Sequence, residues 1–188
     1  MIKKVVTIGP ESTGKSSLCE QLAKHYNTLW CPEYAREYLT IHGMNYTYED
    51  LLTIAKGQVE LEEKYESEVR SRESGVNSQL TTHDSRLFID TDMYVMKVWC
   101  EFVFGPCHQF ILDQIAKRKY DLYLLCNIDL PWTHDQLREY PDPGPRQQLY
   151  GIYKNIMQNQ STPWIEIGGN YQERIQTAIK AVDDLVRQ

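Results

Sequence analysis

Eight residues near the N-terminus have the types and the spacing of a loop that binds phosphate. They read Gly9-Pro10-Glu11-Ser12-Thr13-Gly14-Lys15-Ser16, with two glycines, four residues between them, and then lysine and serine. Apolar residues over 2–8 predict a buried strand before them, and the spacing of Leu18, Leu22 and Ala23 predicts a helix over 17–25. The loop therefore leads into a helix N-terminus, where unpaired backbone N–H groups and the helix dipole attract an anion.

Phosphate is the natural occupant of this phosphate loop, residues 9–16. Gly9 and Gly14 permit backbone angles and a close approach that a β-carbon would prevent. Lys15 can reach the β- and γ-phosphates of a nucleotide, and the Ser16 hydroxyl can ligate Mg²⁺. A glycine turn without a ligand is the alternative, but a chance match occurs in roughly 1 in 100 such chains or fewer. The residues predicted to bind the nucleotide are Gly9, Glu11, Ser12, Thr13, Gly14, Lys15, Ser16 and Ser17.

Side-chain carboxylates follow two further predicted strands. Glu33 comes after a short apolar strand over 28–31, Asp90 ends a strand over 87–90, and Asp92 lies close by. Because the carboxyl ends of parallel strands meet at one edge of a sheet, these groups should converge above the phosphate loop. There Asp90, with Ser16, can hold Mg²⁺ and its hydration shell, and another carboxylate can accept a proton from a hydroxyl group. An exposed loop acid or a helix N-cap is the alternative for each.

Two arginines lie in a late segment that has the composition of a lid. Residues 130–146 are rich in Pro, Asp and Gly and contain Arg138 and Arg146. Planar, permanently charged guanidinium groups can close over the oxygens of a phosphate in transfer and help to exclude water. Solvated surface arginines are the alternative. A further polar residue, Gln58, falls on the apolar side of a long predicted helix, so its amide needs a partner from the protein or from a ligand.

The elements that position these residues alternate between strand and helix. Strands are predicted over 2–8, 28–31, 87–90, 121–127 and 164–167. Helices are predicted over 17–25, from 33, and over 48–72, 93–104, 108–119, 147–160 and 171–186, with a polar connection over 75–82. This order predicts one α/β domain over 1–188 with a mainly parallel sheet of about five strands and helices on both faces.

Composition excludes several other classes of protein. The net charge of −6 leaves no basic surface for nucleic acid or an anionic membrane, and no apolar run approaches the length of a membrane span. The chain enters its first strand at once, so we expect no signal peptide and a cytoplasmic location. Five cysteines without paired spacing predict neither disulfides nor a zinc site. The guanine-recognition motif of GTPases is missing, and nothing sets an oligomeric state.

Several of these segments, in this order, resemble a known family. They are the phosphate loop, Glu33-Tyr34-Ala35-Arg36-Glu37, Phe88-Ile89-Asp90-Thr91-Asp92, Pro131-Trp132 with Asp135 and Arg138, and Arg146-Gln147-Gln148. Together they look like the ribosylnicotinamide kinase domain of NadR-type NAD-biosynthesis proteins. The resemblance implies a P-loop kinase fold and transfer of the γ-phosphate of ATP, with Mg²⁺, to the 5′-hydroxyl of nicotinamide riboside.

The resemblance also assigns residues to roles. Glu33, Arg36, Asp90 and Asp92 match substrate and catalytic positions, Arg138 and Arg146 match the lid, and similar proteins tend to have glutamine at Gln58. The family has a tryptophan directly before the glutamate-tyrosine pair, where this chain has Pro32. An aromatic contact with the nicotinamide would then come from Trp30, Tyr34 or Tyr48. The family's DNA-binding and adenylyltransferase modules are not in this sequence, which predicts a free-standing kinase or an excised domain.

Two other hypotheses are left open by the residues. The acceptor could be another nucleoside, because the acceptor pocket is the least legible part of the sequence. The chain could also hydrolyse ATP slowly and act as a nucleotide-dependent switch on a partner. The residues alone do not distinguish ATP from GTP, or Glu33 from Asp92 as the base.

Overall fold

The sheet has five parallel strands in a computed structural model that describes residues 2–73 and 85–187. The predicted connection over 75–82 lies outside these residues. The strand order is β2-β3-β1-β4-β5, where β1 is Lys3–Ile8, β2 is Leu29–Cys31, β3 is Arg86–Asp90, β4 is Leu122–Cys126 and β5 is Trp164–Ile167. The predicted α/β fold is therefore confirmed. All residues of β3 and β4 are buried, as continuous apolar strands in a sheet covered on both faces should be.

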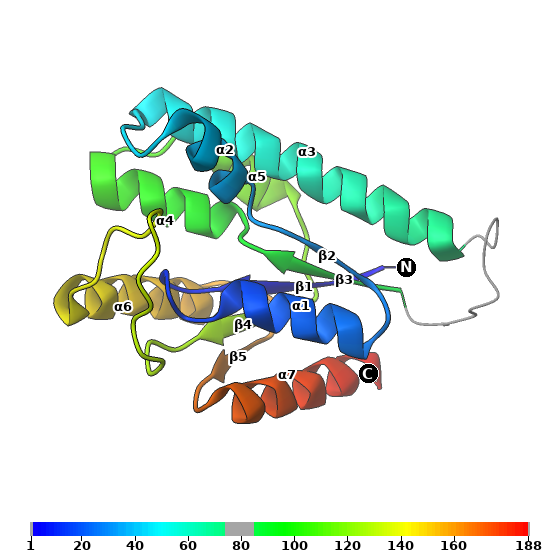
Figure 1. Cartoon of the computed structure of the whole chain (residues 1–188). Coiled ribbons are helices and arrows are strands. Elements are labelled where there is room, and N and C mark those ends of the chain that lie inside the picture. The colour runs from blue at the N-terminus through cyan, green and yellow to red at the C-terminus, as the bar shows by residue number, and fades with distance from the viewer. Residues whose placement is uncertain (1, 74–84, 188) are drawn as a thin grey trace.

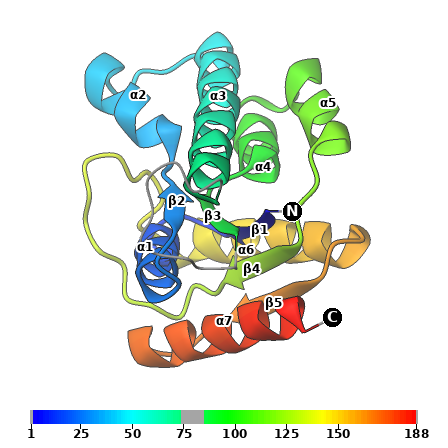
Figure 2. The same cartoon turned by 90° about the vertical axis from the view of Figure 1, so that its right-hand side faces the viewer.

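Helices cover the two faces of the sheet (Figures 1 and 2). On one face α1, Lys15–His25, and α7, Tyr171–Val186, pack over a core that includes Leu22 and Leu124. On the other face lie α3, Tyr48–Glu73, α4, Met93–Phe104, and α6, Pro143–Asn159. A further layer contains α2, Tyr34–His42, and α5, Gln109–Lys117, which enclose a third apolar cluster with α3 and α4.

The topology opens a crevice at one edge of the sheet. After β1 the chain moves to β2 on one side, and after β3 it crosses to β4 on the other side. The segments that follow β1 and β3 therefore leave in opposite directions. Because these two strands are neighbours, a crevice forms between the two segments, and ligands bind at such a point in open α/β sheets. The phosphate loop follows β1 and the residues after Asp90 follow β3, so both candidate segments lie at this crevice.

The lid is shorter than the sequence predicts. Helix α6 begins at Pro143, four residues before the predicted start, so Arg146 is a helical residue and the lid spans residues 130–142. Proline is compatible with the first turn of a helix, because the N–H group that it lacks would have no partner there. The Pro143 and Pro145 pair therefore starts the helix, although a proline-rich segment normally indicates a loop.

Candidate active site

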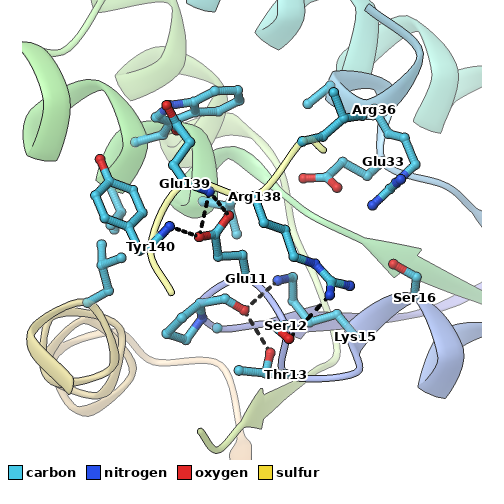
Figure 3. Close-up of a pocket in the computed structure, with 18 of the residues that line it drawn as sticks. Glu11, Ser12, Thr13, Lys15, Ser16, Glu33, Arg36, Arg138, Glu139 and Tyr140 are labelled. Carbon is cyan, nitrogen blue, oxygen red and sulfur yellow. Dashed lines mark hydrogen bonds between the residues drawn. The ribbon is translucent and has the colours of Figure 1, made fainter. Parts of the chain in front are cut away.

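The phosphate loop connects the end of β1 to the start of α1, and Figure 3 shows the side chains that it contributes to the site. Gly9 has φ +139°, and a β-carbon there would lie 2.7 Å from the Cys126 carbonyl oxygen, so no other residue fits. The Thr13 hydroxyl donates to the Pro10 carbonyl at 2.7 Å. The Lys15 ammonium donates to the same carbonyl at 2.8 Å. The loop is therefore pre-shaped, with its one lysine held across it.

A cavity of about 320 Å³ begins at this loop. Its wall continues over the start of α2, one side of α4 and the lid, and it includes Glu33, Arg36 and Arg138. Cavities of this size hold small molecules. All three were predicted as site residues, Arg36 through the family resemblance alone, and in the structure they line one cavity with the phosphate loop.

Asp90 ends β3 and is not among the residues that line the cavity, but its charge interacts with Lys15 and Glu33 of the cavity wall. Its side chain is 1% exposed, and among the residues that the structure describes neither carboxylate oxygen has a hydrogen-bond partner. Burial, and then the charge of Glu33, raise the pKa of Asp90, while Lys15 and the Ser16 hydroxyl act in the opposite direction. A buried carboxylate without a partner is costly, so the site is suited to a cation.

Glu33 stands at the edge of the cavity, directly before α2. The Thr91 hydroxyl donates to the Glu33 carboxylate at 3.3 Å, which ties the end of β3 to the end of β2. Arg36, one turn further along α2, forms an ion pair of 2.9 Å with Asp135 of the lid. The start of α2 therefore presents one carboxylate, Glu33, and one guanidinium group, Arg36, toward the cavity, as Figure 3 shows.

Asp92, predicted to bind substrate, has a different place. It is the N-cap of α4, where its carboxylate accepts from the Tyr94 and Val95 amides at 3.0 and 3.3 Å. The Tyr123 hydroxyl donates to its other oxygen at 2.8 Å, and burial raises the pKa of Asp92 to about 7. Asp92 is 1% exposed and does not line the cavity, so the N-cap alternative describes it and the substrate contact does not.

The amide of Gln58 is paired within the protein and does not line the cavity. Its oxygen accepts from the Tyr34 amide at 2.7 Å, and its nitrogen donates to the Pro32 carbonyl at 3.3 Å. The Tyr34 ring lies so close to Gly57 that a β-carbon there would be 2.1 Å from it. Gln58 and Tyr34 therefore support the turn that carries Glu33.

Two of the aromatic residues predicted to contact the acceptor, Trp30 and Tyr48, also lie outside the cavity. Trp30 packs against the core under α1 and α7. Tyr48 stacks on His108, with ring centroids 3.6 Å apart. Trp30, Tyr34 and Gln58 were predicted to contact substrate. In the structure their side chains contact other parts of the protein, and none of the three lines the cavity.

The aromatic wall of the cavity comes instead from α4, which the sequence predictions did not assign to the site. Trp99 and Phe102 line it together with Val95 and Val98. Their spacing of three and four residues places them on one side of a helix. This periodicity is visible in the sequence, but it equally describes a helix face buried in the core, so the spacing alone did not indicate a binding site.

Both predicted arginines reach the phosphate loop. The Arg138 guanidinium donates to the Ser12 hydroxyl at 3.3 Å and to the Thr133 carbonyl. Arg146 is 7% exposed, donates to the Ser12 carbonyl at 3.5 Å and lies over the Trp132 ring. Burial lowers the pKa of Arg146. Of these two arginines only Arg138 lines the cavity, so Arg146, which was predicted as catalytic, contacts the loop without being part of the cavity wall.

These features define a P-loop nucleotide-binding protein of the α/β class, with an arginine of the lid over the phosphate loop. The chain belongs to the AAA domain family, whose sequence profile matches residues 4–174. Within residues 2–73 and 85–187, no helix has the length and apolar character that crossing a membrane requires.

Relatives of known name confirm the resemblance to NadR. The trifunctional NAD biosynthesis/regulator protein NadR of Salmonella typhimurium is 25% identical over 193 residues, which cover 98% of this chain and 43% of that protein. NadR of Escherichia coli is 24% identical, with the same coverage. The chain thus spans less than half the length of these curated relatives.

Solved structures show the same fold. A crystal structure of NadR protein in complex with NR has a TM-score of 0.70 and 22% identity, and the match covers 98% of this chain and 51% of that one. A complex of NadR with NAD and AMP-PNP also gives 0.70, at 21% identity, and covers 99% and 50%. Thymidylate kinase from Ehrlichia chaffeensis gives 0.58 at 11% identity, covering 96% and 98%.

Proposed function

We propose that this chain is a kinase that transfers the γ-phosphate of ATP to the 5′-hydroxyl of nicotinamide riboside, giving nicotinamide mononucleotide. The observation that carries the proposal is a single cavity with the phosphate loop at one end and with Glu33, Arg36 and Trp99 in its wall. Similarity to NadR, including a structure described as a complex with NR, supports this acceptor. We place the reaction in the cytoplasm, in NAD salvage.

The phosphate loop is the proposed site for the triphosphate of ATP. Its backbone N–H groups and the N-terminus of α1 would bind the phosphate oxygens, and the Lys15 ammonium would exchange the Pro10 carbonyl for the β- and γ-phosphates. A NadR structure with AMP-PNP supports ATP as the donor. The charge that develops on the oxygens in transfer would be stabilised by Lys15 and by Arg138, which already contacts Ser12.

Asp90 and Ser16 are the residues that would hold Mg²⁺. The fit rests on the two unpartnered, buried oxygens of Asp90, together with the nearby Ser16 hydroxyl, because hard oxygen donors of this kind suit Mg²⁺. When bound, Mg²⁺ neutralises charge on the phosphate oxygens. Burial raises the pKa of Asp90, and a cation bound beside it would lower that pKa again and so stabilise the ionised carboxylate.

Glu33 is the proposed general base. The acceptor hydroxyl would lose its proton to the Glu33 carboxylate while its oxygen forms a bond to the γ-phosphorus and the bond to the leaving ADP oxygen breaks. The sequence did not distinguish Glu33 from Asp92 as the base. The Asp92 carboxylate already accepts three hydrogen bonds within the protein, which favours Glu33 as the group that accepts the proton. Trp99 and Phe102 offer flat apolar surfaces to the base of the acceptor.

The test is the initial rate of ADP formation with nicotinamide riboside, adenosine, cytidine and deoxynucleosides as acceptors. We expect ADP to form fastest with nicotinamide riboside and only slowly without any acceptor. A faster rate with another nucleoside would identify a kinase of that nucleoside. Equal rates with and without acceptors would replace the kinase by an ATP-hydrolysing switch.

A further inference from the structure

A row of hydrogen bonds joins α4 to the lid through Tyr46, between two residues that line the cavity, Trp99 and Glu139. The Trp99 indole N–H donates to the Tyr46 hydroxyl oxygen at 3.0 Å. The Tyr46 hydroxyl in turn donates to the Glu139 carboxylate, at 2.8 and 3.0 Å from its two oxygens. Trp99 is part of the aromatic wall, so one end of this row lies where the acceptor is proposed to bind.

The same lid residue is also held by the phosphate loop. The Glu139 backbone N–H donates to the Glu11 carboxylate at 2.9 and 3.1 Å, and the Tyr140 N–H donates to it as well. Figure 3 shows Glu11 below Glu139 and Tyr140. Glu11 occupies a position that the phosphate-loop pattern leaves open to any residue, so the pattern itself does not require this acid.

Arg138, the residue before Glu139, is a third contact between the lid and the phosphate loop. It donates to the hydroxyl of Ser12, which directly follows Glu11. Three consecutive lid residues are therefore fixed by two consecutive loop residues. Charge-assisted hydrogen bonds such as those to Glu11 are among the stronger ones, so Glu11 determines where the backbone behind Arg138 lies.

We propose that Glu139 is a positioning residue that couples the two substrate sites through a latch formed by Glu11, Tyr46, Trp99 and Glu139. The latch holds Arg138 over the phosphate loop, and an acceptor against Trp99 stabilises its closed arrangement. This inference rests on the proposed kinase function, because it needs an acceptor beside Trp99. Reciprocity of binding then requires that acceptor and nucleotide tighten each other's binding by the same factor.

Calorimetric titration of the full chain with AMP-PNP, with and without nicotinamide riboside, tests this coupling. In the wild type we expect the acceptor to lower the Kd for AMP-PNP by about 5- to 100-fold, the usual range of coupling between sites. Tyr46→Phe and Glu139→Ala should reduce this factor to below 2-fold, whatever their effect on the Kd for AMP-PNP alone, because the factor compares two titrations of the same variant. Tyr65→Phe, on α3 and outside the cavity, is the matched control and should keep the full factor.

The coupling would be refuted by a wild type that phosphorylates nicotinamide riboside but shows no coupling, or by full coupling in both Tyr46→Phe and Glu139→Ala. Hydrogen exchange of the Glu139 and Tyr140 amides gives a readout that does not depend on the acceptor. In the free protein we expect Glu11→Ala to raise both exchange rates about 10-fold or more, and Tyr46→Phe to raise them less. Unchanged rates in Glu11→Ala would refute the latch itself. Failure to phosphorylate nicotinamide riboside would refute the kinase assignment and this acceptor's part in the coupling, but not the contacts of Glu11 with the lid.

Discussion

The Thr91 hydroxyl donates a hydrogen bond of 3.3 Å to the Glu33 carboxylate, and the Thr91 backbone has φ +79°. A β-branched residue is rarely found in this left-handed region, and such strain costs of order 1–3 kcal/mol. Thr91 is 1% exposed and stands directly after the unpartnered carboxylate of Asp90. The strained turn therefore holds the proposed metal ligand and the proposed base in one fixed relation.

Thr91→Val tests whether this bond positions the base. Valine keeps the shape and the branching of threonine but removes the hydroxyl, so Glu33 loses its contact while the strained backbone is retained. We expect a fall of about 10-fold in kcat/KM for the acceptor, because misplacing a catalytic group by a fraction of an ångström has effects of this size. Thr91→Ser keeps the hydroxyl and should stay within 3-fold of wild type; equal rates for the two variants would contradict the prediction.

Lys15→Met removes the ammonium of the phosphate loop. Without substrate this group contacts only the Pro10 carbonyl among the hydrogen bonds described for it, so the fold should lose little. Loss of an electrostatic contact made to the transferring group typically lowers the rate about 100- to 1000-fold. We therefore expect kcat to fall by this factor with a nearly unchanged melting temperature. Full turnover in Lys15→Met would remove the phosphate-transfer assignment.

Asp90→Asn should separate stability from activity. Replacing a buried carboxylate that has no partner removes a desolvation cost, so the variant should be at least as stable as wild type, by up to about 2 kcal/mol. Its kcat should fall by about 100-fold or more, with a higher Mg²⁺ requirement. Thermal melting and rates across a Mg²⁺ titration measure both effects.

Asp142→Asn is the matched control for this prediction, since Asp142 is exposed and outside the cavity. Both its melting temperature and its Mg²⁺ dependence should match those of the wild type. An Asp90→Asn protein that is markedly less stable, yet has wild-type Mg²⁺ dependence, would show that Asp90 has a structural role only.

The fold could be predicted from sequence because each of its signals is local. Apolar strands, helix periodicity and the phosphate loop gave all five strands and the parallel arrangement, and carboxylates at strand ends placed Glu33 and Asp90 at the right edge. The assignment failed where a polar or aromatic residue has two possible environments. Gln58 and Asp92 are buried and paired within the protein, and no spacing rule separates that outcome from contact with a ligand.

Contacts between distant segments were beyond the sequence for a related reason. Glu11 and Glu139 are 128 positions apart, and the bond between them joins a side chain to a backbone amide, which any residue except proline supplies. The place of Trp99 in the cavity wall could not be predicted either, because an apolar helix face can cover a core or line a cavity. Only the packing of α4 beside the crevice decides between them.

The pKa of Asp92 gives a prediction for stability against pH. Burial raises this pKa from 3.8 to about 7 in the folded protein. Between these values the folded protein binds a proton that the unfolded chain releases, so the free energy of unfolding falls as pH rises through that window. The upper bound of this effect is about 4 kcal/mol. Asp92→Asn accepts the same Tyr94 amide bond but does not titrate, so it should lack this part of the pH dependence.

Urea unfolding of wild type and Asp92→Asn at pH 5, 6, 7 and 8 measures the difference. We expect wild type to lose stability from pH 5 to pH 8 by a few kcal/mol more than the variant. The amide bonds and the Tyr123 hydroxyl favour the ionised form and oppose burial. If they prevailed, the pKa of Asp92 would not be raised, wild type and variant would show the same dependence on pH from pH 5 to pH 8, and Asp92 would be a charged N-cap at neutral pH.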